Sequence, residues 1–190
     1  YGQDFGPDAP VCLVVKEVGV DAFYGNYPLA GLVERFAATP GAPRLIKAPE
    51  RLTPGEVAAL YRSADTLVHP YRGEGFGLPV IEAMATGLPV IVTAGGATDD
   101  FARGESVLSL PARRREVELD EPCAGMPWVL EPDREELVRQ LRRAVTDGQE
   151  LRRAARARSR EVRRDWTWSR AAARAAARLA GAAAEVASPS

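Results

Sequence analysis

One segment, from Thr66 to Thr93, restricts the fold of this chain more than any other. It starts with a short apolar run that ends at Pro70, passes through a glycine-rich loop, and continues into Leu78–Thr86, which has proline near its start and glycine directly after its end. Proline suits the first turn of a helix and glycine its C-terminal end. A second apolar run, Pro89–Thr93, follows at once. The segment therefore predicts a strand, a helix and a second strand, the pattern of a parallel sheet.

Elements of the same kind lie before and after this segment. The run Val11–Val15 is apolar and rich in β-branched residues, as expected of a parallel strand that is buried on both faces. We also expect a helix over Pro28–Ala38, a brief strand at Leu45–Ile46, a helix that opens with a Thr53 and Glu56 capping box, and an edge strand at Val107–Leu110. This alternation predicts an α/β fold, with a Rossmann-like parallel sheet and helices on both faces.

The last third of the chain predicts a helical C-terminal segment. Arg113 to Gly125 is interpreted as a charged surface loop, and helical periodicity then begins at Asp133. The expected buried stripe of the first helix is Leu137, Leu141 and Val145. A second helix is expected over about 150–164. Trp166 and Trp168 are expected to pin a third helix onto the sheet.

These patterns predict a single domain over residues 1–190. Its α/β core is expected at about 11–130, its C-terminal helices at about 133–181 and a frayed tail at 182–190. The composition narrows the class of protein. A net charge of −1 gives no overall attraction to nucleic acid or to an anionic membrane, and two cysteines are too few for a disulfide framework. With one histidine and no apolar run of membrane-spanning length, we expect a soluble cytoplasmic protein without a structural metal.

The loop between the strand that ends at Pro70 and the helix that starts near Pro79 has the chemistry of an anion site. Gly75 and Gly77 allow backbone conformations and a close approach that a side chain would prevent. The N-terminal end of the helix favours a phosphate through its dipole and its free amides. Glu74 lies just before this end and Glu82 one turn inside it, where carboxylates can accept hydrogen bonds from sugar hydroxyls. A nucleoside diphosphate-sugar fits this arrangement, with one acid for the hexose and the other for the ribose.

The residues from Arg72 to Ile91 resemble the signature of the group 1 retaining glycosyltransferases of GT-B architecture. Enzymes of that family carry two glutamates separated by seven residues, and Glu74 and Glu82 have this spacing. The likeness extends more loosely from Val11 to Arg178 and implies the C-terminal, donor-binding domain of two Rossmann-like domains. The N-terminal domain, which binds most of the acceptor, would lie outside this sequence, so the chain alone is expected to be inactive.

The resemblance also implies roles for single residues. Glu74 would contact the transferred sugar, Glu82 would bind the ribose hydroxyls, and the backbone amides of Phe76, Gly77 and Leu78 would bind sugar and phosphate oxygens. Lys16, at the end of the first strand, resembles a basic residue that compensates the diphosphate in relatives. The alternative interpretation is a strand-end lysine that reaches solvent.

Three further residue positions have two interpretations each. Arg72 is a candidate to clamp phosphate or sugar, and its alternative is a solvated loop arginine. His69 is expected to be a packed or hydrogen-bonded structural residue and not a catalyst. Asp99 and Asp100 either point toward the donor or cap a helix, and both interpretations fit the sequence.

In the reaction that the resemblance implies, an acceptor hydroxyl attacks the anomeric carbon of a hexose and the nucleoside diphosphate leaves, with retention of configuration. Glu74 and Lys16 are the expected catalytic residues, and the protein stabilises charge on the leaving phosphate. No metal or other cofactor is expected. Two alternatives remain, a non-catalytic nucleotide-sugar-binding module and a GT-B-type sugar-nucleotide epimerase.

Arginine is concentrated near the C-terminus. Between Arg139 and Arg178 there are 13 arginines and 4 acidic residues. We interpret this run as the solvated face of helices, because no aromatic stacking platform accompanies it. The alternative is a surface for nucleic acid or anionic lipid. We expect no nucleic-acid partner, and peripheral membrane association of the full-length protein stays open.

Overall fold

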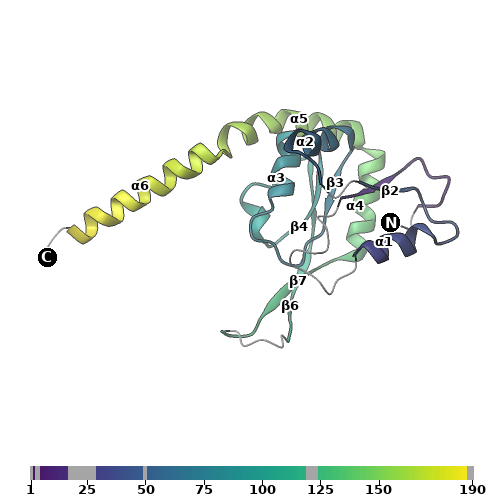
Figure 1. Ribbon diagram of the computed structural model, residues 1–190, viewed down its shortest axis with the longest axis horizontal. Helices are drawn as coiled ribbons and strands as arrows, with labels where there is room; N and C mark the ends of the chain where they lie inside the picture. The colour runs from purple at the N-terminus through teal and green to yellow at the C-terminus, as the bar shows by residue number, and fades with distance from the viewer. Residues whose placement is uncertain (1, 3–4, 17–28, 49–50, 119–123, 188–190) are drawn as a thin grey trace. The chain divides into compact units, whose positions relative to one another are not determined.

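The computed structural model describes residues 2, 5–16, 29–48, 51–118 and 124–187 (Figure 1). It divides into two compact units, residues 1–60 and residues 61–190, and each is described by itself. Every helix within the described residues is too short or too polar to cross a lipid bilayer. The prediction of one domain over the whole chain stays a prediction.

The first unit contains two parallel strands with a helix between them in the chain. Strand β1 (Leu13–Val15) pairs with β2 (Leu45–Lys47), with Leu13 opposite Leu45. Helix α1 spans Leu29–Ala37, so its expected start at Pro28 lies outside the described residues. These elements confirm the strands expected from the apolar runs, but Val14 of β1 is exposed, so the expectation that this strand is buried on both faces is wrong. The parallel pairing follows from the helical crossover between the strands.

Helix α2 (Pro54–Ser63) begins with the expected capping box. The Thr53 N–H donates to Glu56 Oε2 at 2.7 Å, and the Glu56 N–H donates to Thr53 Oγ1 at 3.3 Å. The Thr53 hydroxyl also donates to Glu56 Oε2 at 2.7 Å, and the hydrogen bonds from the Thr53 N–H and hydroxyl hold the pKa of the Glu56 carboxyl below its usual value. The box satisfies two amides that the first turn of the helix leaves unpaired.

The second unit is built around a three-stranded parallel sheet. Strands β3 (Leu67–His69), β4 (Val90–Thr93) and β5 (Val107–Leu110) lie side by side in that order. Every residue of the central strand β4 is buried. The expected strands in this unit are confirmed, including β5 at an edge of the sheet.

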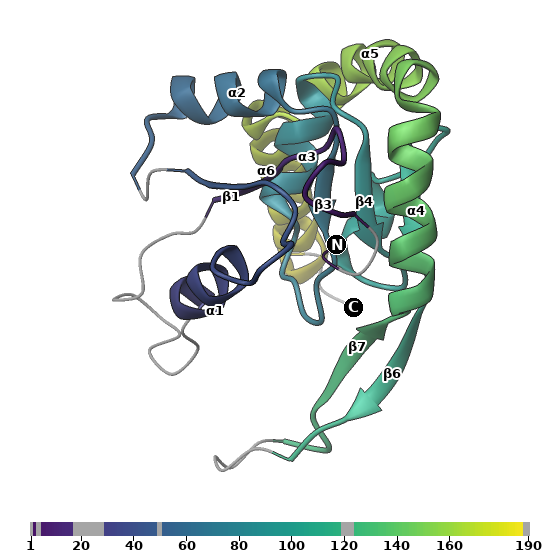
Figure 2. The same cartoon turned by 90° about the vertical axis from the view of Figure 1, so that its right-hand side faces the viewer.

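Helices cover both faces of this sheet (Figure 2). Helix α3 (Leu78–Ala85) shares one hydrophobic cluster with Val90 and Val92 of β4. Ile91, between them in the strand, belongs to a second cluster against which helix α4 (Arg134–Thr146) packs. Because successive strand residues point to opposite faces, this division places α3 and α4 on opposite sides. The α/β fold class is therefore confirmed.

Helix α5 (Gly148–Asp165) packs beside α3 and carries many of the clustered arginines. Arg152 bridges to the start of β3, where its Nη2 donates to the Ala64 carbonyl oxygen and lies 3.1 Å from Asp65 Oδ1. Arg158 and Arg164 form ion pairs within the helix. Part of the arginine cluster is thus engaged in contacts within the protein.

A β-hairpin replaces part of the expected surface loop. Strand β6 (Ala112–Glu116) pairs antiparallel with β7 (Trp128–Pro132), so the loop predicted from Arg113 onward is wrong over its first residues. The Arg114 guanidinium lies 4.4 Å from the centre of the Trp128 ring, a cation–π contact. Charged residues are less common in strands, and β6 is a strand here because its backbone pairs with β7, which is rich in apolar residues.

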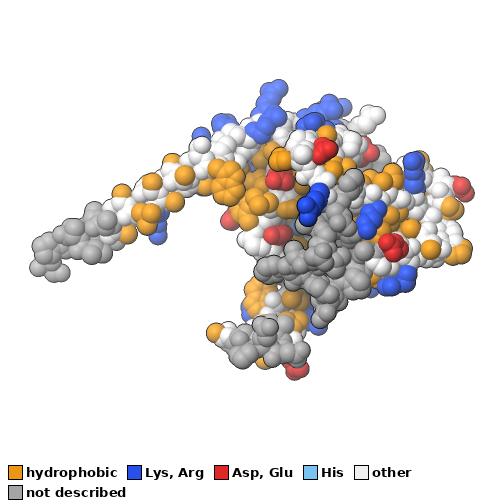
Figure 3. All heavy atoms as spheres, viewed as in Figure 1, with side chains coloured by type: hydrophobic (Ala, Val, Ile, Leu, Met, Phe, Trp, Pro, Cys, Tyr) orange, Lys and Arg blue, Asp and Glu red, His pale blue; other side chains and the backbone are white. Residues whose placement is uncertain are grey.

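The C-terminal helix differs from its prediction in two ways. Helix α6 spans Trp168–Ala187, so the helix continues past residue 181, where a frayed tail was expected to begin. Every side chain from Thr167 to Ala182 is exposed, including Trp168 at 82% and Leu179 at 72%. In Figure 3, hydrophobic side chains lie uncovered along α6. The prediction that Trp168 pins this helix onto the sheet is therefore wrong, and alanine's high helix propensity accounts for the helix.

The buried stripe of α4 is also shifted from its prediction. Leu137 and Leu141 pack against the second hydrophobic cluster as expected. Val145 is half exposed, and Ala144 takes its place in the packing. The 3.6-residue period allows either residue at this turn, and the smaller side chain occupies the close approach to the core.

Candidate functional site

The glycine-rich loop leaves the carboxyl end of β3 and enters α3 through Gly77. Gly77 has a φ of 90°, in the left-handed region, and a Cβ placed there would lie 2.5 Å from Thr98 Cγ2. Its carbonyl oxygen accepts the N–H groups of Val80 and Ile81. Among the residues that the structure describes, no side chain caps the helix N-terminus. The loop therefore presents the positive end of α3, as the sequence predicted for an anion site.

Gly75 differs from Gly77. It does not have a positive φ, and a Cβ placed on it would meet no atom within 4 Å. The prediction that both glycines are needed for the backbone conformation is thus wrong for Gly75. A need for close approach by a ligand at Gly75 stays a prediction.

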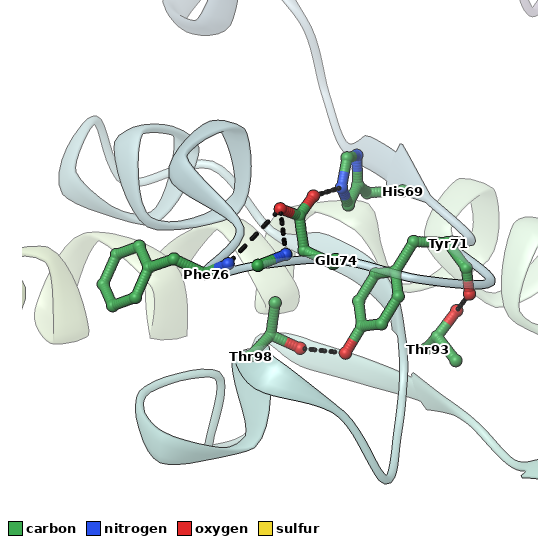
Figure 4. Close-up of polar contacts among 7 residues, drawn as sticks. His69, Tyr71, Glu74, Phe76, Thr93 and Thr98 are labelled. Carbon is green, nitrogen blue, oxygen red and sulfur yellow. Dashed lines mark hydrogen bonds and ion pairs between the residues drawn. The ribbon is translucent and has the colours of Figure 1, made fainter. Parts of the chain in front are cut away.

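Buried hydroxyl groups join this loop to the loop after β4. Tyr71 is buried, and its hydroxyl lies 2.9 Å from Thr98 Oγ1 (Figure 4). Thr93 Oγ1 donates to the Tyr71 carbonyl oxygen at 2.8 Å. A Cβ on Gly96 would lie 2.5 Å from the Tyr71 hydroxyl, so a glycine at this position leaves room for the tyrosine side chain. Sequence analysis missed these contacts, for which the only signal was the glycine pair at 95 and 96.

Asp99 contributes to the turn after β4. Its Oδ2 accepts the Gly95 N–H at 2.9 Å, at the start of a short 3₁₀ helix, η1 (Ala97–Asp100). Helix capping by Asp99 is not observed, since no side chain of the described residues caps η1 and Asp99 instead closes the turn before it. An orientation toward the donor stays a prediction. The turn also carries Thr98, so Asp99 helps to fix the partner of Tyr71.

The Glu74 carboxylate is held by hydrogen bonds on both of its oxygens (Figure 4). Oε1 accepts the N–H groups of Gly75 at 2.9 Å and Phe76 at 3.4 Å. Oε2 lies 3.2 Å from Nε2 of His69. Burial raises the pKa of the Glu74 carboxyl, but hydrogen bonds from His69 and from the amides of residues 75–77 together hold that pKa below its usual value. Glu74 is therefore ionised at neutral pH.

Glu82 lies on the exposed face of α3, one turn after the loop. The Tyr61 hydroxyl donates to Glu82 Oε2 at 3.4 Å. Burial, and then the negative charge of Glu82, raise the pKa of Tyr61 to about 12. Sequence analysis did not assign Tyr61 to the site. It lies half buried, with its polar end against one of the two candidate acids.

Arg72 reaches the hairpin. Its Nη2 lies 2.8 Å from Glu131 Oε2, which also pairs with Nε of Arg115 at 3.2 Å. Burial raises the pKa of Glu131, but the charges of Arg72 and Arg115 and the hydrogen bonds from both arginines together hold that pKa below its usual value. The Leu130 N–H donates to the Arg72 carbonyl oxygen at 2.8 Å, so the loop is also tied to β7 by its backbone. Exposed ion pairs of this kind contribute little stability.

An aromatic cluster supports the loop from its other side. The Phe76 ring lies 5.2 Å from that of Phe101 and 6.0 Å from that of Trp166, measured between ring centres. Phe101 is fully buried, and its ring meets the Trp166 ring edge to face at 5.4 Å. Leu78, the first residue of α3, is exposed. Trp166 therefore packs beside the loop, but it does not pin the last helix onto the sheet as predicted, because the side chains from Thr167 to Ala182 are exposed.

Two predictions concern how the charge of a bound diphosphate is balanced. Lys16 lies directly after β1 in the first unit, whereas Glu74 belongs to the second, and the two units are described separately. Among the described residues, no group of three or more His, Cys, Asp or Glu side chains is arranged to hold a metal ion. The role of Lys16 and the expectation that no metal is required both stay predictions.

Comparison with known proteins identifies a family for this arrangement. The sequence profile of the family Glycosyl transferases group 1 matches residues 22–147. A lipopolysaccharide core biosynthesis mannosyltransferase of Rhizobium meliloti is 52% identical over 46 residues, 24% of this chain and 13% of that protein. An MMP α-(1→4)-mannosyltransferase of Mycolicibacterium hassiacum is 30% identical over 147 residues, 77% of this chain and 32% of the relative. A D-inositol 3-phosphate glycosyltransferase of Corynebacterium urealyticum is 36% identical over 77 residues, 40% of this chain and 18% of that protein. The chain thus spans about a third or less of these relatives.

Proposed function

The chain belongs to the group 1 glycosyltransferase family, and we propose that it is the donor-binding half of a retaining glycosyltransferase of GT-B architecture. The complete enzyme would transfer a hexose from a nucleoside diphosphate-sugar to an acceptor hydroxyl. The observation that carries this proposal is the Glu74 carboxylate, ionised and fixed beside the open N-terminus of α3. That arrangement offers an acceptor for sugar hydroxyls next to donors for phosphate oxygens.

In this proposal each part of the loop binds a different part of the donor. Glu74 accepts a hydrogen bond from the transferred sugar, and the Leu78 amide at the N-terminus of α3 faces the diphosphate. Phe76 and Gly75 shape the approach between these two groups. Glu82 accepts hydrogen bonds from the ribose. Its contact with Tyr61 is long, at 3.4 Å, so a ribose hydroxyl can replace it at little cost.

Charge stabilisation is the chemical task of the site. As the bond from the anomeric carbon to the phosphate breaks, negative charge grows on the leaving diphosphate. The α3 N-terminus stabilises this charge without reorganisation, because its amides are already oriented by the helix. Lys16 would add a positive charge, and Arg72 could do so on release from Glu131. No metal or other cofactor is required by this scheme.

The acceptor is proposed to bind mainly to an N-terminal domain outside these 190 residues. The relatives are at least about three times as long as the parts that match this chain, which supports a second domain. The isolated chain would then bind the donor without transferring its sugar. Two of the relatives are named mannosyltransferases, which makes GDP-mannose the first donor to test, followed by UDP-glucose.

Calorimetric titration of the chain with these two nucleotide sugars tests the proposal. We expect weak but measurable binding, with a dissociation constant below about 1 mM. The binding is expected to be weak because the domain supplies only part of a complete site. Glu74→Gln and Glu82→Gln should each weaken binding by roughly tenfold, because a charged hydrogen bond is lost. Glu105→Gln is the control, since Glu105 is an exposed acid on the loop before β5.

Assays of the full-length protein separate the remaining alternatives. Release of nucleoside diphosphate that depends on an acceptor would support the transferase. Binding without release would indicate a nucleotide-sugar-binding module. A change in the stereochemistry of the donor sugar without an acceptor would indicate an epimerase. Absence of binding to either donor by both the chain and the full-length protein would refute the proposed function.

A further inference from the structure

We propose that His69 is a positioning residue that holds the Glu74 carboxylate in place for the sugar of the bound donor. The inference rests on the proposed function and adds a residue to it, since His69 was expected to be only structural. His69 is the last residue of β3, and its Nε2 lies 3.2 Å from Glu74 Oε2 (Figure 4). The two side chains are 25% and 24% exposed, so the pair is shielded from most of the solvent.

The hydrogen bonds of Glu74 show why the histidine matters. An ionised carboxylate has about four lone-pair sites and donates nothing. Oε1 uses its sites on the Gly75 and Phe76 amides, which belong to the same loop as Glu74. Oε2 accepts the hydrogen bond from His69, and this is the oxygen that we assign to the sugar hydroxyl. The histidine is thus the contact that ties this side chain to the sheet and not to its own loop.

His69 is itself held in place. Its backbone pairs with Val92 in the register of β3 and β4, and its carbonyl oxygen accepts the Tyr71 N–H at 3.1 Å. Its ring centre lies 5.8 Å from that of Tyr71, which is buried. Because the carboxylate only accepts, Nε2 must carry the hydrogen in this contact. An imidazole can donate there in either its neutral or its protonated form.

This arrangement predicts an effect on the sugar and not on the nucleotide. Without His69, Glu74 can rotate with its loop, and the site for the sugar hydroxyl loses its fixed position. The amides at the α3 N-terminus are unaffected, so the diphosphate still binds. Removal of the Nε2 donor should therefore weaken a nucleoside diphosphate-sugar but not the nucleoside diphosphate alone.

The test compares four variants of the whole chain. His69→Leu removes the donor, and His69→Asn keeps an amide that is too short to reach Glu74. His69→Gln places an N–H near the position of Nε2 and should restore the contact. Val68→Ala is the matched control, because Val68 is the adjacent residue of β3, lies half buried and packs against the opposite cluster. Circular dichroism verifies that each variant is folded.

The first measurement needs no ligand. Carbon-13 NMR titration of the Glu74 carboxyl should show a higher pKa in His69→Leu and His69→Asn than in the unaltered chain. His69→Gln should lie closer to the unaltered chain, and Val68→Ala should match it. An unchanged Glu74 titration in His69→Leu and His69→Asn would overturn the proposal, because the pair would then have no influence on the carboxylate.

The second measurement is calorimetry with GDP-mannose against GDP, and with UDP-glucose against UDP. His69→Leu and His69→Asn should weaken the sugar nucleotide by about 5- to 20-fold and leave the diphosphate within about 2-fold. Added to Glu74→Gln, the same changes should cause no further loss, since they act through Glu74. Equal losses for both ligands, or additive losses in the double variants, would overturn the positioning role.

The two proposals fail in different ways. If neither sugar nucleotide binds the unaltered chain, although the His69 variants change the pKa of Glu74, the proposed function is wrong. The proposed role of His69 in donor binding is then wrong as well. If sugar nucleotides bind through Glu74 but the His69 variants bind them normally, the proposed function stands and the inference about His69 is wrong.

Discussion

Replacing Gly77 by alanine should destabilise the second unit strongly, because the added methyl group raises the free energy of the folded state in two separate ways. The first is conformational. At a φ of 90°, in the left-handed region, an alanine is less stable by roughly 1–2 kcal/mol. The second is steric, since the new Cβ would lie 2.5 Å from Thr98 Cγ2, a contact that must be relieved by movement.

The steric cost can be derived from what Thr98 holds. Thr98 is fully buried, and its Oγ1 bonds to the Tyr71 hydroxyl at 2.9 Å. Moving Thr98 breaks this bond between two buried groups, which costs about 1–3 kcal/mol. Gly77→Ala should therefore lower the free energy of unfolding by roughly 2–5 kcal/mol, measured by urea denaturation of the chain.

A matched glycine and a second-site change separate the two costs. Gly73→Ala lies in the same loop, has no positive φ and meets no atom within 4 Å, so we expect less than about 0.5 kcal/mol. Thr98→Ser deletes the clashing methyl but keeps the hydroxyl. In combination with Gly77→Ala it should recover the steric part and leave the conformational part of roughly 1–2 kcal/mol. If Gly77→Ala were as mild as Gly73→Ala, or if Thr98→Ser rescued nothing, the reasoning would be refuted.

Two further predictions concern the aromatic cluster and the ionised glutamate. Trp166→Ala should lower the free energy of unfolding by about 2–4 kcal/mol in urea denaturation and weaken donor binding through Phe76, whereas Trp168→Ala, at an exposed position, should change stability by less than about 0.5 kcal/mol. Because the pKa of Glu74 is lower in the folded chain than its usual 4.5, its contribution to stability is full above that value and is lost as pH falls through the folded-state pKa. Glu74→Gln should reduce the acid dependence of the urea midpoint below pH 4.5, and an unchanged dependence would contradict the observed hydrogen bonds.

Local patterns in the sequence predicted the sheet of the second unit well. The run Pro89–Thr93 is apolar at every position except its last, because β4 is buried on both faces, and this pattern is visible without any tertiary information. The ends of α3 were also predictable, since proline and glycine act on their own backbone. Features whose cause lies within a few residues are thus accessible from sequence.

The hairpin and the last helix were not predictable in this way. Three consecutive arginines in β6 favoured a loop, and only pairing with Trp128–Pro132, distant in the chain, makes that segment a strand. Trp168 has the spacing of a buried residue on an amphipathic helix, yet it is exposed in the structure. Hydrophobic spacing shows which face of a helix could be buried, but not whether another surface is available to bury it.

The same limit applies to the candidate site. The spacing of Glu74 and Glu82 and the glycines between them identified the loop, because a helix N-terminus and its preceding turn are local. The partners of Glu74 were not identified. His69 lies five residues before it, at the end of a strand, and their contact depends on how the loop folds back over the sheet. The link between Tyr71 and Thr98 likewise depends on the neighbouring strand order.

Gly75 shows how the requirements of folding and of binding can be separated at one loop. Its backbone conformation is open to any residue, and nothing lies within 4 Å of a Cβ placed there, so Gly75→Ala should fold with the stability of Gly73→Ala. Its N–H already donates to Glu74 Oε1, so a methyl group at this position lies beside the proposed sugar contact. We expect Gly75→Ala to weaken GDP-mannose or UDP-glucose at least about 5-fold while urea denaturation shows no change. Normal binding by a stable Gly75→Ala chain would mean that the donor does not approach the loop at Glu74, because only a ligand can give this glycine a function.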